Sequence, residues 1–122
     1  MQTVLVAGGA GFIGTHLCES LLKENYKIIC VDNLITSDKK NIEKLLSNPN
    51  FKHIEHDIIN PLSDLLLEEV DFIFHLASPA SPNKKSPRSY INFPIQTLLA
   101  NSAGTKNLLD LAKGKNAKFF YV

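Results

Sequence analysis

The chain has 122 residues, of which 44% are hydrophobic and 20% are charged, and its net charge is +1 at pH 7. This length fits one domain, and the composition is that of a globular protein with an apolar core. A net charge so close to zero gives no electrostatic reason to expect binding to nucleic acid or to an anionic membrane, and no apolar run reaches the ~20 residues of a membrane span.

The beginning of the chain and its two cysteines bear on the compartment. A predicted strand starts two residues after Met1, which leaves no room for a signal peptide. Cys18 and Cys30 lie in apolar contexts without CxxC spacing, so we expect buried thiols rather than a disulfide or a metal site. Both features favour a cytoplasmic protein that holds no metal.

Short β-rich runs alternate with helical stretches along the chain. In chain order, the apolar pattern predicts a strand at residues 3–8, a helix at 12–24, a strand at 26–33 and a short helix at 37–47, with Ser37 or Asp38 as its N-cap. A strand at 51–58, a short helix at 61–69 and a strand at 70–78 follow. The proline-rich residues 78–94 predict a loop, and a long helix at 94–113 precedes a fifth strand at 117–122.

Alternating strands and helices define the expected fold. Strands that are apolar throughout argue for a parallel sheet covered by helices on both faces. Right-handed crossovers then favour a three-layer, Rossmann-like doubly wound α/β sheet with strand order 3-2-1-4-5. Because neither a repeat nor a linker interrupts the pattern, we expect a single domain over residues 1–122.

The segment VAGGAGFIG, between the first strand and the first helix, carries the clearest motif. Gly8, Gly11 and Gly14 fit G-x-x-G-x-x-G, and Gly9 with the last two also fits G-x-G-x-x-G. The early glycines allow a tight turn, Gly11 lets the backbone approach a pyrophosphate, and Gly14 allows close packing of helix on strand. The helix N-terminus would then face the anion. The alternative is a glycine-rich turn that binds nothing.

Asp32 ends the second predicted strand, eighteen residues after Gly14. A carboxylate at this place can accept hydrogen bonds from both ribose hydroxyls of an adenosine, and it would repel a 2′-phosphate. The pattern therefore predicts NAD rather than NADP as the ligand, with an ordinary surface aspartate as the alternative. Lys39 and Lys40 fit the solvated face of the following helix.

Further candidate residues follow the third and fourth predicted strands. Asp57 ends the third strand and, with Ile58, could bracket an adenine ring, although a capping role for Asp57 is also open. Ala77 and Ser78 are small residues at the sheet edge where ligands bind in open α/β folds. His75 is expected to be a packed or hydrogen-bonded strand residue rather than a catalyst.

The segments VAGGAGFIG, VDNL, HDI and HLASPASP resemble the extended short-chain dehydrogenase/reductase superfamily of NAD-dependent epimerases and dehydratases. The resemblance covers essentially the whole chain, and HLASPASP is most similar to the UDP-glucuronate decarboxylase branch, which makes UDP-xylose. The resemblance implies NAD as the cofactor, the nucleotide sugar UDP-glucuronate as the substrate, and a homodimeric parent enzyme.

The resemblance also implies roles for individual positions. It places the pyrophosphate at Gly11, Phe12 and Ile13, the adenosine ribose at Asp32, Asn33 and Thr36, the adenine at Asp57 and Ile58, further cofactor contacts at Leu76 and Ser78, and the sugar nucleotide at Leu62, Asn107 and Lys113. The chain departs from the decarboxylases at Leu99, Ala100 and Gly114, where they carry Lys, Thr and Arg.

Members of this superfamily use a Tyr-x-x-x-Lys pair, in which the lysine lowers the pKa of the tyrosine so that the phenolate acts as a general base. The resemblance implies transient oxidation of the sugar by NAD, loss of CO₂ and return of the hydride. None of Tyr26, Tyr90 and Tyr121 has a lysine four residues later. We therefore expect the catalytic residues and a substrate domain beyond Val122, and we expect this chain alone to be inactive.

Two other classes of function stay open, and we also expect the chain to associate with copies of itself. The chain could belong to a dTDP-glucose 4,6-dehydratase or a UDP-glucose 4-epimerase, or it could be a non-catalytic dinucleotide-binding module. The last strand would form an apolar sheet edge, and exposed edges promote pairing with other chains. We expect self-association through residues 119–122.

Overall fold

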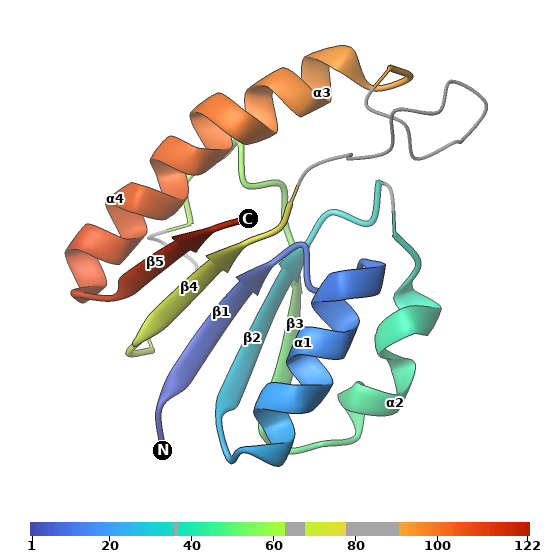
Figure 1. The fold of residues 1–122 in the computed structure, drawn as a ribbon, viewed down its shortest axis with the longest axis vertical. Coiled ribbons are helices and arrows are strands. Elements are labelled where there is room, and N and C mark those ends of the chain that lie inside the picture. Colours follow the sequence, from blue (N-terminus) through green and yellow to red (C-terminus); the bar gives the residue numbers. More distant parts are fainter. Residues whose placement is uncertain (36, 63–67, 78–90) are drawn as a thin grey trace.

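A parallel β-sheet forms the centre of the molecule in a computed structural model, which describes residues 1–35, 37–62, 68–77 and 91–122 (Figure 1). Its five strands are β1 (Thr3–Ala7), β2 (Lys27–Asp32), β3 (Phe51–Glu55), β4 (Phe72–His75) and β5 (Lys118–Tyr121). They pair in parallel in the order β3-β2-β1-β4-β5. The predicted Rossmann-like sheet and its strand order are confirmed.

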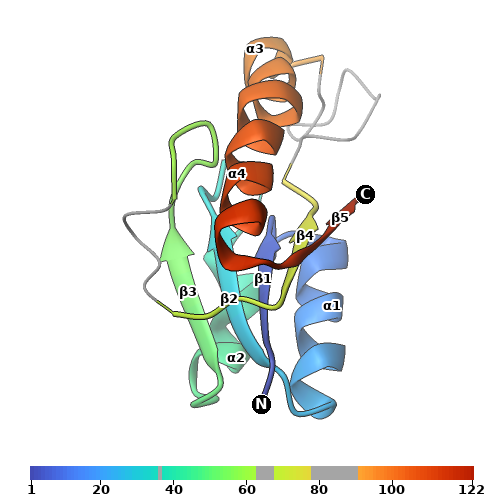
Figure 2. The same cartoon turned by 90° about the vertical axis from the view of Figure 1, so that its left-hand side faces the viewer.

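Helices cover both faces of this sheet (Figures 1 and 2). One face carries α1 (Phe12–Lys23) and α2 (Glu43–Leu46), the latter preceded by a 3₁₀ turn at Lys39–Ile42. The other face carries one long helical rod, composed of α3 (Pro94–Leu99), a π-helical segment at Ala100–Gly104, and α4 (Thr105–Lys115). None of the helices in the described ranges is long and apolar enough to cross a membrane.

Side-chain alternation along the strands divides the core into two clusters. Leu5 and Ile29 pack with Leu108 of α4 on one face. Val4 and Ile28 pack with helical residues on the other face, together with Cys18 and Cys30. Successive residues of a strand point to opposite faces, so a continuous apolar strand supplies both layers. The two cysteines are buried and free, as the sequence predicts.

The turn after β3 corrects one boundary. The predicted strand at 51–58 ends at Glu55, because Asp57 starts a turn: its Oδ1 accepts from Ile59 N at 3.2 Å and its carbonyl accepts from Asn60 N at 3.0 Å. Asp57 therefore lies two residues beyond the strand and does not end it. An aspartate that bonds the backbone two residues on is typical of turns.

Other boundaries shift in the same way. The expected strand at 70–78 is shorter, at Phe72–His75, and its pairing with β1 ends opposite Ala7, where the glycine loop leaves the sheet. The expected helix at 37–47 divides into the 3₁₀ turn and α2, and its N-cap is Asp38, whose Oδ1 accepts from Lys40 N at 3.0 Å. The long helix ends at Lys115 because Asn116 adopts a left-handed conformation with φ 54°. Most of the expected helix at 61–69 falls outside the described residues.

β5 lies at the edge of the sheet, where β4 is its partner. Phe120 stacks on Phe74 with ring centroids 4.7 Å apart, yet it stays 42% exposed. Tyr121 and Val122 are also exposed. The predicted apolar edge is therefore present in the described part of the chain, and self-association through it stays a prediction.

Candidate functional site

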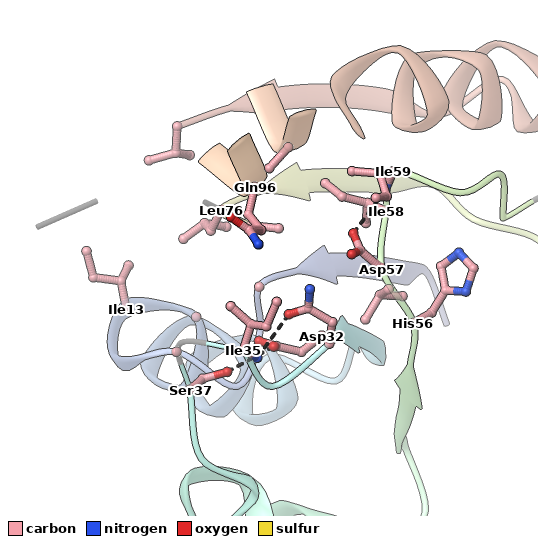
Figure 3. Close-up of a pocket in the computed structure, with 18 of the residues that line it drawn as sticks. Ile13, Asp32, Ile35, Ser37, His56, Asp57, Ile58, Ile59, Leu76 and Gln96 are labelled. Carbon is pink, nitrogen blue, oxygen red and sulfur yellow. Dashed lines mark hydrogen bonds between the residues drawn. The ribbon is translucent and has the colours of Figure 1, made fainter. Parts of the chain in front are cut away.

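A cavity of about 510 Å³ opens at the carboxyl ends of the strands (Figure 3). The glycine loop and the start of α1 form its floor, the segment after β2 and the turn after β3 form one wall, and α3 with the π segment lies on the far side. This is the edge at which open parallel sheets bind ligands.

The tight geometry of the glycine loop explains two of its glycines. Gly8 has φ +84°, and a Cβ there would stand 2.7 Å from the carbonyl carbon of Leu76. A Cβ on Gly14 would stand 2.2 Å from the carbonyl oxygen of Gly8. Backbone meets backbone at both positions, so the fold itself requires glycine there.

Gly11 is different. A Cβ at this position would meet Gly8 O at an ordinary 3.4 Å and no nearer atom, and the residue lines the cavity. Its φ of −74° suits any residue. The fold does not need glycine at position 11, and a side chain there would occupy the space in front of the loop, which therefore fits a ligand that rests against the backbone.

The N-terminus of α1 points at the same space. Gly11 is the N-cap and supplies no side-chain cap to the 12-residue helix. Phe12 and Ile13 follow, both exposed and both lining the cavity. Uncapped N–H groups at a helix N-terminus bind anions readily, because they carry partial positive charge.

Asp32 is held firmly beside this loop. It is 8% exposed, its Oδ2 accepts from Ala10 N at 3.1 Å, and its Oδ1 accepts from Leu34 N at 2.8 Å and from Ser37 Oγ at 2.9 Å (Figure 3). A carboxylate offers about four acceptor sites, so three bonds orient it and leave capacity for a ligand hydroxyl. Ser37 contributes to this site through its hydroxyl and not as a helix cap.

His75 lies beneath the cavity. It is 1% exposed, and its Nδ1 accepts from Ala77 N at 3.3 Å, which assigns the ring proton to Nε2. Nε2–H then donates to Ala100 O at 3.1 Å, with Thr105 Oγ1 also at 3.1 Å. Burial lowers the pKa of this histidine, only partly offset by the bond to Ala100. The prediction of a packed, hydrogen-bonded residue is confirmed.

Acidification is expected to destabilise the chain through His75. An unfolded histidine titrates near 6.5, whereas folding lowers the pKa of His75. Below about pH 6.5 the unfolded state therefore binds a proton at this histidine, whereas the folded state keeps the ring neutral. The free energy of unfolding consequently falls by up to about 1.4 kcal/mol for each unit by which the pH is lowered. Urea titrations between pH 7.5 and 5 measure this slope. The His75→Gln variant should have a shallower slope, and an equal slope would contradict the assignment.

The structure brings most of the predicted cofactor residues together. Those that line the cavity are Gly8, Gly11, Phe12, Ile13, Gly14, Asp32, Asn33, Asp57, Ile58, Leu76 and Ala77. Thr36 and Ser78 lie outside the described residues. The residues that the resemblance assigned to the sugar nucleotide do not line the cavity: Leu62 is in the core, Lys113 is exposed on α4, and Asn107 bonds the carbonyl of Ile58.

Several lining residues have no signature in the sequence. Ile35 and Ser37 follow the predicted acid, His56 and Ile59 flank the predicted pair after β3, and Gln96, Leu99 and Ala100 come from the helical rod. Gln96 extends from α3 toward the cavity (Figure 3). Proximity in sequence to Asp32 and Asp57 could have suggested the first four. The resemblance marked Leu99 and Ala100 only as departures from the decarboxylases, and no local pattern marks Gln96.

The glycine turn, the uncapped helix N-terminus and the acid at the end of β2, placed on a 3-2-1-4-5 parallel sheet, are the features of the Rossmann-like class of α/β proteins. The sequence identifies the family within this class. A model of the NAD dependent epimerase/dehydratase family matches residues 4–122, and the chain belongs to that family.

Relatives with assigned names are similar over almost the whole chain. UDP-glucuronic acid decarboxylase 1 of Danio rerio is 44% identical over 117 residues, which are 96% of this chain and 26% of the relative. UDP-glucuronic acid decarboxylase 2 of Arabidopsis thaliana is 45% identical over 116 residues, 95% of this chain and 24% of the relative. The chain thus spans about a quarter of the length of the curated relatives it matches.

Solved structures of the family share the fold. UDP-glucuronic acid 4-epimerase from Bacillus cereus, in complex with NAD, has a TM-score of 0.78 and 34% identity, covering 98% of this chain and 39% of that protein. dTDP-glucose 4,6-dehydratase from Bacillus anthracis, also in complex with NAD, has a TM-score of 0.77 and 29% identity, covering 99% and 37%.

Proposed function

We propose that this chain is the NAD-binding part of a nucleotide-sugar enzyme that decarboxylates UDP-glucuronate to UDP-xylose. The observation that carries the proposal is the open backbone cradle at Gly11 beside the fixed carboxylate of Asp32, both lining one cavity. NAD, when bound, supplies a hydride acceptor that later returns the hydride to the sugar.

The proposed ligand contacts follow from the chemistry of the lining residues. The N–H groups of Phe12 and Ile13 at the α1 N-terminus bind the pyrophosphate. Asp32 and Asn33 bind the adenosine ribose, Asp57 and Ile58 bind the adenine, and the backbone around Leu76 and Ala77 lies along the dinucleotide. Thr36 and Ser78 complete the proposed set from the sequence.

The decarboxylation itself requires residues that we do not place in this chain. Among the described tyrosines, Tyr26 packs against Phe72 and has Cys30 rather than lysine four residues later, and Tyr121 donates its hydroxyl to Asn101 Oδ1. We propose that the general base and the substrate domain belong to a longer protein, and that the 122 residues alone do not turn over UDP-glucuronate.

A 4-epimerase or a 4,6-dehydratase is the second candidate, because solved structures with these activities share the fold. The decarboxylase is favoured since its relatives reach 45% identity over the chain, against 34% for the UDP-glucuronic acid 4-epimerase. A third possibility is a non-catalytic dinucleotide-binding module. It would have the same cavity, and it would differ only in that a longer protein containing this chain would not turn over a nucleotide sugar.

Titration calorimetry with NAD and NADP tests the shared part of these functions. We expect saturable NAD binding and at least about tenfold weaker NADP binding, because the Asp32 carboxylate repels a 2′-phosphate. Heat denaturation with and without each ligand is the control, since a ligand that binds only the folded state raises the melting temperature. No saturable binding of either dinucleotide would refute the proposal.

A further inference from the structure

A hydrogen bond from helix α4 holds the turn after β3 in place. The carbonyl oxygen of Ile58 accepts a hydrogen bond from Asn107 Nδ2 of α4 at 2.8 Å, across 49 residues of sequence. The Ile58 side chain is 4% exposed and packs in the same cluster as Leu108 and Leu111. Asn107 does not line the cavity, although Ile58 does.

The side chain of Ile58 packs directly against the backbone of Gly104. A Cβ at position 104 would stand 2.6 Å from Ile58 Cδ1 and 2.8 Å from Cγ1. The backbone at Gly104 has φ −63° and ψ −45°, which are ordinary helical values. The helix itself does not need glycine at this place, so the packing of Ile58 explains it.

Within the described part of the chain, most other hydrogen bonds of the turn join residues that are close in sequence. Asp57 bonds Ile59 N and Asn60 N, and His56 Nε2 lies 3.0 Å from Asn60 O. The link to the neighbouring strand is a long one, from His56 N to Asp32 O at 3.3 Å. These bonds shape the turn, but they do not set its distance from the helical rod across the cavity.

We propose that Asn107 and Gly104 are positioning residues that fix Asp57 and Ile58 as a preformed wall selective for adenine. The inference rests on the proposed NAD function and deepens it. Asn107 acts through the carbonyl of Ile58 without touching the ligand. A wall that is already ordered reduces the entropy lost on binding, and a fixed Asp57 carboxylate accepts from the exocyclic amino group of adenine, which is a donor. Hypoxanthine has a carbonyl group where adenine has the exocyclic amino group, so it presents a hydrogen-bond acceptor to the Asp57 carboxylate instead of a donor.

The Asn107→Asp variant tests this role, with Lys113→Gln as the matched control. Aspartate keeps the size of Asn107 but faces Ile58 O with an oxygen, and both substitutions lower the net charge by one on the same helix. We expect Asn107→Asp to bind NAD about tenfold more weakly and to bind the hypoxanthine analogue of NAD almost as the unmodified chain does. Hydrogen exchange of the amides at 56–60 should accelerate in Asn107→Asp and not in Lys113→Gln.

Gly104→Ala provides a second variant, because alanine favours a helix and should not impair folding. Its Cβ displaces Ile58, so we expect the preference for NAD over the hypoxanthine analogue to fall while the chain still unfolds cooperatively on heating. Adding Ile58→Val, which removes Cδ1, should restore the preference in part.

The outcomes separate the two proposals. Equal NAD affinity in Asn107→Asp and Lys113→Gln, or an equal loss for NAD and for the analogue, overturns the positioning role. Unchanged exchange at 56–60 overturns it as well, whether or not a ligand binds. Failure of the unmodified chain to bind NAD refutes the proposed function, whereas a chain that binds NAD regardless of residue 107 refutes only this inference.

Discussion

Gly14→Ala is expected to leave little folded protein. Its Cβ would lie 2.2 Å from Gly8 O and 2.7 Å from Gly9 Cα, so the whole of α1 would have to move away from the loop. Because backbone atoms cannot move aside as the end of a flexible side chain can, we expect such a contact to lower the free energy of unfolding by about 4 kcal/mol or more. Small domains are stable by only about 5–15 kcal/mol, so a loss of this size removes most of the free energy of unfolding of a domain at the lower end of that range. Circular dichroism during heating should show no cooperative transition.

Gly11→Ala is the matched control, with the same added methyl group three residues earlier. The added atom meets Gly8 O at 3.4 Å and extends into the cavity. We expect a stability loss of only about 0.5 kcal/mol at the N-cap, together with NAD binding weakened by about 1–3 kcal/mol, or roughly 5- to 150-fold. Loss of folding in Gly11→Ala, or unchanged NAD affinity, would contradict the assignment of this glycine to the ligand.

Asp32→Ala is expected to weaken NAD binding about a hundredfold and to abolish the preference over NADP. Hydrogen bonds to a charged group contribute about 1.5–3 kcal/mol each, and the variant removes the acceptor for the ribose while also removing the charge that repels a 2′-phosphate. It also leaves the N–H groups of Ala10 and Leu34 without their acceptor, which should cost about 2–4 kcal/mol of stability. Calorimetry at a temperature where the variant is folded gives both affinities.

Asp38→Ala serves as the control for this substitution. It removes the same charge six residues later, and it loses one cap bond to Lys40 N in an exposed position. We expect a stability loss of about 1 kcal/mol and an unchanged ratio of NAD to NADP affinity. If Asp32→Ala kept the ratio of the unmodified chain, the carboxylate would not be the element that selects NAD.

The sequence contained most of the fold because its apolar runs are unambiguous. β1 and β2 are apolar at nearly every position, and the glycine loop and Asp32 follow them in the spacing that a dinucleotide-binding sheet requires. Boundaries were less certain where two local interactions compete. β3 ends at Glu55, two residues before Asp57, because the Asp57 carboxylate takes part in a turn, and apolar content alone cannot reveal that competition.

The rest of the site depends on contacts between distant segments. Asn107 of α4 donates a hydrogen bond to the carbonyl of Ile58 in the turn after β3. Gln96 approaches the cavity from α3, whose sequence has no ligand motif. The resemblance assigned Asn107 to the sugar nucleotide, whereas the structure shows one N–H of its amide bonded to a backbone carbonyl. Periodicity predicts which face a helix buries, but not which single side chain reaches a particular loop.

The two buried thiols allow the motion of the glycine loop to be followed without introducing a new residue. A Cβ on Gly9 would stand 2.6 Å from Cys30 Sγ and 3.3 Å from Cys18 Sγ, so both sulfur atoms lie directly against the loop backbone. The hydrogen bond with Cys18, together with burial, raises the pKa of the Cys30 thiol, which keeps it protonated and unreactive. Because both sulfur atoms are fully buried, an alkylating reagent reaches them only when the loop or α1 opens away from the sheet. The rate of thiol modification therefore reads out how often this part of the molecule opens.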